Sequence, residues 1–341
     1  MIPRTGKSRA GAAALLACIG FIHTTFGQGS LTPPGPPQPT MKSLSEVEPR
    51  TVIAALPITI TNSGSYYLTG SLTGVAAFNG ITIAASDVAL DLNGYALVGV
   101  PGSLTGILVP NAQTNLVVRN GVIRNWGGSG VSGFSTIHSG RFTDLIATAN
   151  ASLGLGLGYD CVVKNCVANE NLSYGIEANI GSVVADCTAN YNGSDGIRGQ
   201  YFLCRDCVSS FNGGTGIFAY NYSRVLHCHS AQNALDGIAL GIACHALENT
   251  SVNNDTSGGA TSAGIRSFYA IGHIEGNFVQ FSSGIGIFVN TNLSLLSTGW
   301  TVTKNRTRGP IATAYVYPAG NDIGPIGDAA TSTSPWANLR N

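Results

Sequence analysis

Six asparagines recur at a nearly constant interval along the middle of the chain. They are Asn150, Asn171, Asn192, Asn212, Asn233 and Asn254, and the steps between them are 21, 21, 20, 21 and 21 residues. Other positions keep the same period: Ala or Ser stands three residues before each of these asparagines, and a Gly-Ile step follows most of them at a fixed offset. Such self-similarity is typical of repeat folds, in which each repeat packs on the next.

The residues within each repeat favour strands over helices. In the segment 186–189, Cys187 and Ala189 face one side of a strand and Thr188 the other, since strand side chains alternate. The chain has 45 glycines, and no stretch of it keeps a clean 3.6-residue apolar period. Two-helix repeats also need periods of about 33–47 residues. Stacked coils would let the asparagines pass amide hydrogen bonds from one coil to the next. The sequence therefore predicts an all-β, single-domain, right-handed parallel β-helix with coils of about 21 residues.

Several segments carry a resemblance to a known superfamily. They are the stretches 165–168 and 186–189, the asparagine column, the Gly-Ile steps and Leu90-Asp91-Leu92-Asn93-Gly94, and together they span about Ile58 to Val316. The chain resembles the pectin-lyase-like superfamily of secreted right-handed β-helix proteins. That superfamily includes polysaccharide lyases, glycoside hydrolases, epimerases, phage tailspikes and non-catalytic surface proteins, so the resemblance implies the fold but not one activity.

The chain divides into four predicted segments. Residues 1–27 have a basic start, an apolar run from Ala10 to Ile22 and small residues at the end, which is the pattern of a secretion signal. A lipoprotein signal ending at Cys18 is the less favoured alternative, because Leu16 fits that pattern poorly. A proline-rich linker (28–50), the β-helix (51–318) and a C-terminal cap or tail (319–341) follow. No later segment is apolar enough for a membrane span, so we expect a secreted or cell-surface protein.

The composition limits the choice of partner. Charged residues make up 10% of the chain, against a usual value of about 25%, and the formal net charge is zero. Nucleic acids call for a basic surface and are therefore excluded as partners. Uncharged Asn, Ser, Thr, Gly and Tyr on strand surfaces suit neutral hydroxylated partners such as polysaccharides or cell-surface glycans.

One candidate site is the column of residues that precedes the cysteines of each repeat. Its candidate binding or acid–base residues are Asp186, Asp206, His227 and Glu248, together with His229, which follows Cys228 and shares the outward face with His227. On adjacent coils about 4.8 Å apart, such side chains could hold a cation, with Ca²⁺ as one candidate, or exchange protons. Lyases of the superfamily generally use a calcium-binding acidic cluster with an Arg or Lys base, and here Arg205 is the one arginine that stands beside Asp186 and Asp206. The alternative is structural, since Asp and Asn are common at corners that need left-handed backbone.

A second candidate pair precedes the Gly-Ile steps. Asp195 and Asp236 are expected two coils apart, about 9–10 Å, which is near the upper separation of the carboxylates in inverting glycosidases. The alternative is turn chemistry, for which Asp-Gly is a common signal. Glu177 and Arg198 occupy equivalent positions on adjacent coils and predict an ion pair between coils.

Two further features bear on the site. The cysteines that follow the signal number seven, and Cys166, Cys187, Cys207 and Cys228 are expected to stack inward, as free thiols or as disulfides. Residues 255–263 interrupt the period and lengthen one Gly-Ile step to 27 residues, from Gly237 to Gly264, and loops inserted in a solenoid often carry binding function.

Two functions from different classes agree with these patterns. The first is a secreted β-helix protein that binds or processes an extracellular polysaccharide, as a lyase or glycoside hydrolase if it is an enzyme. The second is a non-catalytic structural or adhesive surface protein. The aspartate signatures of the superfamily's polygalacturonases are absent from the sequence, and no catalytic residue is assigned.

Overall fold

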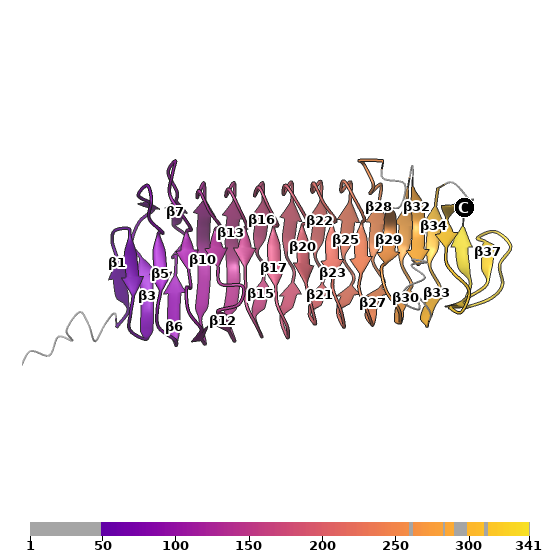
Figure 1. The fold of residues 1–341 in the computed structure, drawn as a ribbon, viewed down its shortest axis with the longest axis horizontal. Coiled ribbons are helices and arrows are strands. Elements are labelled where there is room, and N and C mark those ends of the chain that lie inside the picture. Colours follow the sequence, from indigo (N-terminus) through magenta and orange to yellow (C-terminus); the bar gives the residue numbers. More distant parts are fainter. Residues whose placement is uncertain (1–48, 259–261, 282–283, 290–298, 310–312, 341) are drawn as a thin grey trace, which may run out of the picture. The chain divides into compact units, whose positions relative to one another are not determined.

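The computed structural model describes residues 49–258, 262–281, 284–289, 299–309 and 313–340. The predicted signal, Cys18 and most of the predicted linker lie outside the described residues. The described part is a stack of parallel strands without an α-helix, a β-solenoid of about 11 turns (Figure 1). The predicted all-β repeat fold is confirmed. The described part of the chain contains no helix with the length and apolarity that a membrane span requires.

Each coil contributes one strand to a 12-stranded parallel sheet, and this strand begins at or near the Gly-Ile step. Its strands are β2 (Ile58–Ile60), β5 (Ile81–Ile83), β8 (Ile107–Leu108), β11 (Val131–Ser132), β14 (Leu155–Gly156), β17 (Ile176–Ala178), β20 (Ile197–Gly199), β23 (Ile217–Ala219), β26 (Ile238–Leu240), β29 (Ala263–Ser267), β32 (Ile285–Val289) and β35 (Tyr315–Val316). In most coils an isoleucine of this strand points inward and stacks on the isoleucine of the next coil, as Ile176 does on Ile197. The residue after it points outward.

The rest of each coil belongs to a 24-stranded sheet that bends at a corner into two stacks. Before the corner lie β1 (Thr51–Ile53), β3 (Gly64–Leu68), β6 (Val88–Asp91), β15 (Val162–Lys164), β18 (Val183–Ala185), β21 (Leu203–Arg205), β24 (Arg224–Leu226), β27 (Cys244–Leu247), β30 (Gly272–Glu275), β33 (Trp300–Thr303) and β36 (Asp322–Ile323). After it lie β4 (Leu72–Thr73), β7 (Ala96–Val98), β16 (Val167–Asn169), β19 (Thr188–Asn190), β22 (Val208–Ser210), β25 (His229–Ala231), β28 (Thr250–Val252), β31 (Phe278–Gln280), β34 (Arg306–Arg308), β37 (Ile326–Asp328) and β38 (Asn338–Arg340).

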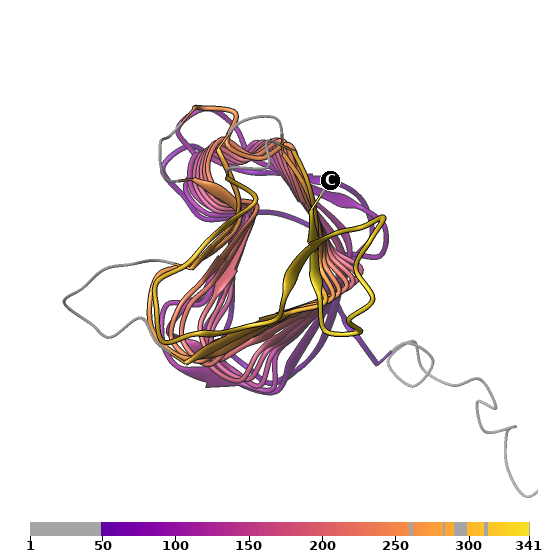
Figure 2. The ribbon, with the colours of Figure 1, turned by 90° about the vertical axis from the view of Figure 1, so that its right-hand side faces the viewer.

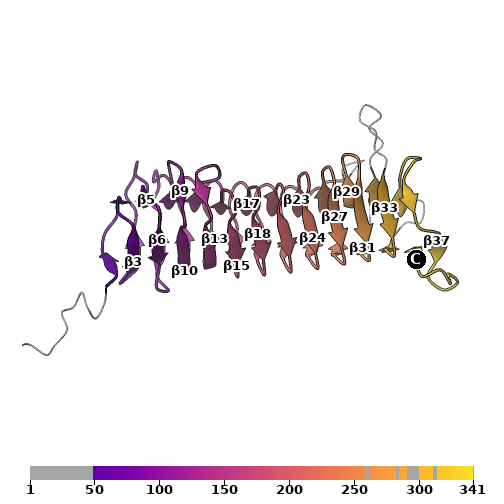
Figure 3. The ribbon, with the colours of Figure 1, turned by 90° about the horizontal axis from the view of Figure 1, so that it is seen from below.

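Two long strands run through the corner and join both stacks. They are β10 (Val117–Arg124) and β13 (Arg141–Thr148). The loop between β11 and β13 carries β12 (Ile137–His138), which pairs with β9 (Gln113–Thr114) in a small separate sheet. Seen along the long axis, successive coils superimpose (Figure 2), and seen from below, their strands stand side by side (Figure 3). Register is therefore kept from coil to coil, which is what lets like residues stack.

The predicted asparagines form a ladder inside the solenoid. In each coil the side-chain Nδ2 donates to the Oδ1 of the next asparagine, as from Asn171 to Asn192 at 3.0 Å and from Asn212 to Asn233 at 2.9 Å. The same Oδ1 also accepts the backbone N–H of the preceding asparagine, at 3.1 Å for the Asn171 N–H and Asn192. All six side chains are buried. The ladder satisfies polar groups at a corner that would otherwise be costly to bury.

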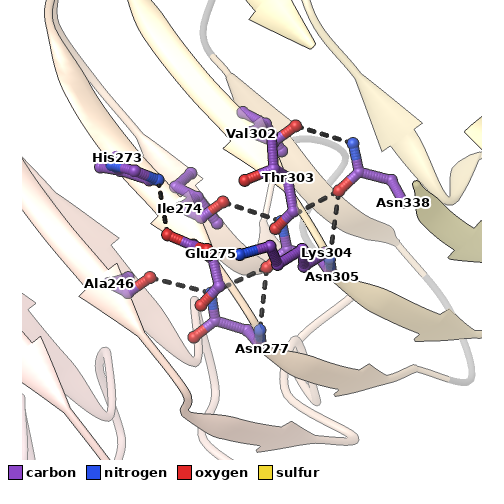
Figure 4. A network of polar contacts seen from close by, with 10 residues as sticks. All are labelled: Ala246, His273, Ile274, Glu275, Asn277, Val302, Thr303, Lys304, Asn305 and Asn338. Atoms are coloured by element: carbon purple, nitrogen blue, oxygen red, sulfur yellow. Dashed lines mark hydrogen bonds and ion pairs between the residues drawn. The ribbon is translucent and has the colours of Figure 1, made fainter. Parts of the chain in front are cut away.

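A second asparagine ladder, which the sequence analysis missed, begins where the cysteine stack ends. Asn249, Asn277, Asn305 and Asn338 pass the same amide bonds at 3.0, 2.9 and 3.1 Å. Figure 4 shows the last three of these asparagines. Their steps are 28, 28 and 33 residues, so the 21-residue period does not reveal them. Asn338 lies in β38, within the segment 319–341 that the sequence predicted as a cap or tail. The described part of that segment carries three strands and ends the stack.

Candidate functional site

The first candidate column lies at the corner between the two stacks of the large sheet. Asp186, Asp206, His227 and Glu248 are exposed, and each has a positive φ between 51° and 55°. A left-handed residue at this point turns the chain, and Asp and Asn tolerate that conformation well. His229 lies two residues after His227, at the start of β25, where it is exposed. The corner geometry therefore accounts for these residue types without a ligand.

Within this column the structure brings three side chains together. The His227 ring stands between two carboxylates, with Nε2 3.1 Å from Glu248 Oε2 and Nδ1 3.7 Å from Asp206 Oδ1. Asp206 also accepts a hydrogen bond from Arg205 at 2.7 Å. Asp186 lies instead 3.8 Å from the ammonium of Lys164. The column is thus a row of surface polar contacts, among them the ion pairs Lys164–Asp186 and Arg205–Asp206, and a surface ion pair contributes about 0–1 kcal/mol to stability.

This column does not assemble a calcium cage in the described part of the chain. No three carboxylate or histidine donors of the column lie within 4.8 Å of one another there. The interrupted segment 255–263, of which residues 259–261 lie outside the described residues, follows β28, whereas Glu248 precedes that strand. The described residues 255–258 therefore lie at the opposite end of β28 from the column.

The second candidate pair lies at the edge of the 12-stranded sheet. Asp195 and Asp236 each precede a Gly-Ile step, and the register of β20, β23 and β26 places them two coils apart. Each is buried and accepts a backbone N–H of the next coil: Asp195 that of Thr215 at 2.8 Å, and Asp236 that of Ala263 at 2.7 Å. Burial raises the pKa of both, that of Asp236 to about 6. Both carboxylates secure turns, and both hold a proton more tightly than an exposed aspartate does.

Arg198 is the centre of a polar cluster on the outer face of this sheet. It projects from β20 and lies between two aromatic rings, 4.1 Å from the centroid of Tyr174 and 5.1 Å from that of Tyr220. Its guanidinium approaches Glu177 at 3.4 Å and Asp195 at 3.6 Å, and donates to the Tyr220 hydroxyl at 2.7 Å. The predicted ion pair between Glu177 and Arg198 is present. The cluster holds one cation and two carboxylates.

The ionisation of this cluster is shifted toward protonated acids. Burial raises the pKa of Glu177, while the charge of Arg198 lowers it and that of Asp195 raises it. Burial likewise raises the pKa of Asp195 and of Tyr220. A carboxyl group with a raised pKa beside an open space is suited to donate a proton near neutral pH.

Such a space lies directly beside the cluster. It is a pocket of about 210 Å³, and its walls include Glu177, Arg198, Gln200, Tyr220 and Phe134. Phe134 comes from the loop between β11 and β13, and its carbonyl accepts a hydrogen bond from Asn179 Nδ2 at 3.3 Å. At about 30 Å³ per water molecule, the volume corresponds to about seven waters, enough for a single sugar ring. Glu177 and Arg198 had a sequence signal as outward residues that follow a Gly-Ile step, whereas Phe134 had none.

The same face carries a second arginine in a similar setting three coils further on. Arg266 occupies the position equivalent to Arg198, by the register of β20, β23, β26 and β29. Its guanidinium lies 4.3 Å from the ring of Phe268 and 5.5 Å from that of Phe288, and 3.8 Å from the carboxylate of Asp236. The outer face of the 12-stranded sheet therefore presents arginines and aromatic rings along the stack.

Three thiols meet inside the solenoid, a group that the sequence did not predict. All seven cysteines from Cys161 to Cys244 are free and buried, and the sulfurs of Cys204, Cys207 and Cys228 lie within 4.8 Å of one another. A metal ion there would require thiolates. Three thiolates around a monovalent or divalent ion would leave net negative charge in an apolar core, which costs several kcal/mol. All three side chains are buried, and burial disfavours the charged thiolate, so packed neutral thiols fit this site better.

No protein-family model and no curated protein matches the sequence. Among solved structures, the fold is similar to the A-module of mannuronan C-5 epimerase AlgE6 from Azotobacter vinelandii, with a TM-score of 0.68, 14% identity, and coverage of 86% of this chain and 90% of that one. The fold is also similar to the A-module of AlgE4 from the same organism, with a TM-score of 0.67, 14% identity, and coverage of 81% of this chain and 88% of that one. For ORF18 of Geobacillus virus E2 the TM-score is 0.55 and the identity 18%, and the match covers 73% of this chain and 54% of that one.

These likenesses establish the architecture. The chain is a right-handed parallel β-helix protein, as the sequence predicted. At 14–18% identity they establish the fold alone.

Proposed function

We propose that this protein binds and processes an extracellular polysaccharide on the outer face of the 12-stranded sheet, and that the pocket at Glu177, Arg198 and Tyr220 holds one sugar unit. The observation that carries the proposal is the pocket itself. It combines aromatic rings, an amide and a carboxyl group of raised pKa around a space of about 210 Å³. Sugar rings offer C–H faces to aromatic side chains and hydroxyls to polar ones, so this combination suits them.

The outer face of the 12-stranded sheet is long in the direction of the solenoid axis, which suits an extended polymer. Outward residues of the 12-stranded sheet follow one another at about 4.8 Å along the axis, the spacing of paired strands. An extended glycan that lies along this axis would pass the Arg198 cluster and then the Arg266 cluster, each flanked by aromatic rings. The names of the similar epimerase modules point to mannuronan, a polysaccharide, as their substrate, and this supports the same general class here.

The acid–base groups of the pocket suggest how processing would occur. Glu177 lines the pocket and its pKa is raised by burial, so it is placed to give a proton to a glycosidic oxygen or to take one from a sugar carbon. Arg198 holds Glu177 in place and balances its charge once the proton has left. Asp195 accepts the Thr215 N–H and lies beside Arg198, so it would hold the Arg198 side chain in position. The proposed class is a lyase or glycoside hydrolase, exported by the signal predicted in residues 1–27.

The test is a polysaccharide panel incubated with purified protein, with and without calcium. Absorbance of unsaturated products detects a lyase, reducing ends detect a hydrolase, and a glycan array detects binding alone. Glu177→Gln should lower cleavage or binding at least about tenfold, since it removes one charge-assisted hydrogen bond. Glu248→Gln removes the same charge from the exposed corner and serves as the matched control. An unchanged Glu177→Gln protein would overturn the proposal.

A second candidate function is a non-catalytic structural or adhesive surface protein. It is favoured by the corner column, where left-handed backbone explains Asp186, Asp206, His227 and Glu248 without a ligand. Binding on the array without cleavage would support a binding module. No signal in either assay would support the structural role.

A further inference from the structure

The sulfurs of Cys204, Cys207 and Cys228 form a triangle in the interior of the solenoid. Each lies within 4.8 Å of the other two, and the Cys204 and Cys228 sulfurs are 3.8 Å apart. All three side chains are buried. Among the residues that the structure describes, they are the only group of three or more potential metal ligands whose donor atoms come this close together. The group is called the thiol triangle below.

The triangle exists because Cys204 stands beside the cysteine stack and not in it. Cys207 and Cys228 are successive members of the stack, by the register of β22 and β25. Cys204 comes from β21, on the other side of the corner, and points inward in a column where the adjacent coils carry Val184 and Val225. Valine packs at this position one coil before and one coil after, so the core itself does not require a sulfur there.

The size of the triangle suits one small ion bonded to all three sulfurs. In zinc sites a metal–sulfur bond is about 2.3 Å long, and three sulfurs at that distance around one atom lie about 4 Å from one another. The 3.8 Å separation of Cys204 and Cys228, and the limit of 4.8 Å on the other two separations, are close to this spacing. Thiolate sulfur favours soft ions over hard ones. The geometry therefore selects a soft ion with three ligands.

The charge of the ion decides which soft ion the interior accepts. Three thiolates carry three negative charges, and a monovalent or divalent ion leaves part of that charge uncompensated in an apolar core, which is unfavourable. A trivalent ion compensates it completely. The apolar side chains of Val184 and Val225 on the adjacent coils therefore favour a trivalent ion in the thiol triangle.

We propose that the thiol triangle binds the trivalent metalloid arsenic(III) as a neutral complex with three arsenic–sulfur bonds. Arsenous acid, As(OH)3, is the uncharged form that arsenite takes in neutral water. Each thiol gives its proton to one hydroxyl group, which leaves as water, while the sulfur bonds to arsenic: As(OH)3 + 3 RSH → As(SR)3 + 3 H2O. Arsenic stays trivalent, so the reaction needs no oxidant or reductant. Reactants and products are all uncharged, which makes the reaction compatible with a buried apolar site.

The binding experiment loads the full chain with sodium arsenite in the presence of a phosphine reductant. Because the sulfurs are buried, arsenite is added both to the folded protein and during refolding from denaturant. Native mass spectrometry should show the gain of one arsenic atom and the loss of three hydrogens. X-ray absorption at the arsenic edge should show three sulfur neighbours and no oxygen neighbour. Zinc, offered in the same way, should bind at least about tenfold more weakly than arsenite, because its charge does not balance three thiolates.

Two variants test the role of the third sulfur. Cys204→Val installs the residue that both adjacent coils carry, so the core should still pack, and it should weaken arsenite binding at least about tenfold. The matched control is Cys244→Ser, which removes a buried thiol outside the triangle and installs the residue that Ser223 provides at the equivalent position one coil earlier. It should bind arsenite as the unsubstituted protein does.

Several outcomes would overturn the proposal. They are failure of both loading routes to give an arsenic adduct, an oxygen neighbour on the bound arsenic, unchanged binding by Cys204→Val, an equal loss with Cys244→Ser, or zinc binding as tight as that of arsenite. The count of sulfur neighbours in the unsubstituted protein decides the matter even if a variant fails to fold. None of these measurements involves the Glu177 pocket, so the result is independent of the proposed function.

Discussion

The asparagine ladder can be tested by truncating one of its central members. Asn192 is buried, and its side chain makes four hydrogen bonds. Its Nδ2 donates to the Ala168 carbonyl at 2.9 Å and to Asn212 Oδ1 at 3.0 Å. Its Oδ1 accepts from the backbone N–H of Asn171 at 3.1 Å and from that residue's Nδ2 at 3.0 Å. Asn192→Ala removes all four.

The expected loss follows from this count. At about 1 kcal/mol of net stability per hydrogen bond, the substitution should lower the free energy of unfolding by about 4 kcal/mol. The Asn171 N–H would be left buried without its partner, which adds to the cost. Because each coil contacts mainly its neighbours, the damage should be greatest in the adjacent coils.

The matched control is Asn169→Ala in an adjacent coil. Asn169 is half-buried, and its Oδ1 accepts one hydrogen bond, from the Asn190 N–H at 2.9 Å. Its loss should cost about 1 kcal/mol. Guanidinium denaturation gives the two free energies, and hydrogen exchange shows which amides lose protection. A difference of less than about 1 kcal/mol between the variants would refute the argument that the ladder stabilises this corner.

Three further predictions follow from the packing and the ionisation of the core. Gly196→Ala should destabilise the protein by several kcal/mol, because a Cβ there would meet the backbone of the next coil at 2.9 Å, whereas Gly70→Ala, with nothing within 4 Å, should be neutral; thermal denaturation measures both. The pKa of Asp236 rises from 3.8 to about 6 on folding. Its protonated form therefore adds at most about 3 kcal/mol to the free energy of unfolding below about pH 4, and this contribution is lost as the pH rises through about 6. Asp236→Asn should flatten this part of the stability–pH profile, and an unchanged slope would contradict the assignment. The seven thiols from Cys161 to Cys244 should react with a thiol reagent only after unfolding, so rapid labelling of the native protein would show that the cysteine stack is open.

Much of the fold could be predicted because the residues that stack on successive coils recur in the sequence at a fixed period. The ladder from Asn150 to Asn254 and the inward isoleucines after each glycine both follow from the 21-residue repeat. The ladder from Asn249 to Asn338 escaped prediction because its coils are longer and unequal. Asparagines stack when they occupy the same position on successive coils. A longer coil increases the number of residues between them but leaves that position unchanged.

The candidate sites were harder to predict than the columns. The sequence pointed to the corner column of Asp186, Asp206, His227, His229 and Glu248, where the structure shows surface ion pairs on a left-handed turn. It named Asp195 and Asp236 for their spacing, but not their burial or the Arg198 that approaches Asp195. Contacts between coils of different length, such as that of Phe134 with the Glu177 pocket, had no sequence signal.

The strict period specifies the kind of fold, since it forces equivalent residues to stack and their backbones to pair. Which charged side chains line a pocket depends on the tertiary structure. The Glu177 pocket needs a loop of one coil to close over the sheet of later ones. The depression over β6, β10, β13 and β15 needs Arg119, Arg141 and Lys164 to share one face. Both depend on register across coils of unequal length, which is fixed by packing in three dimensions and leaves no regular trace along the chain.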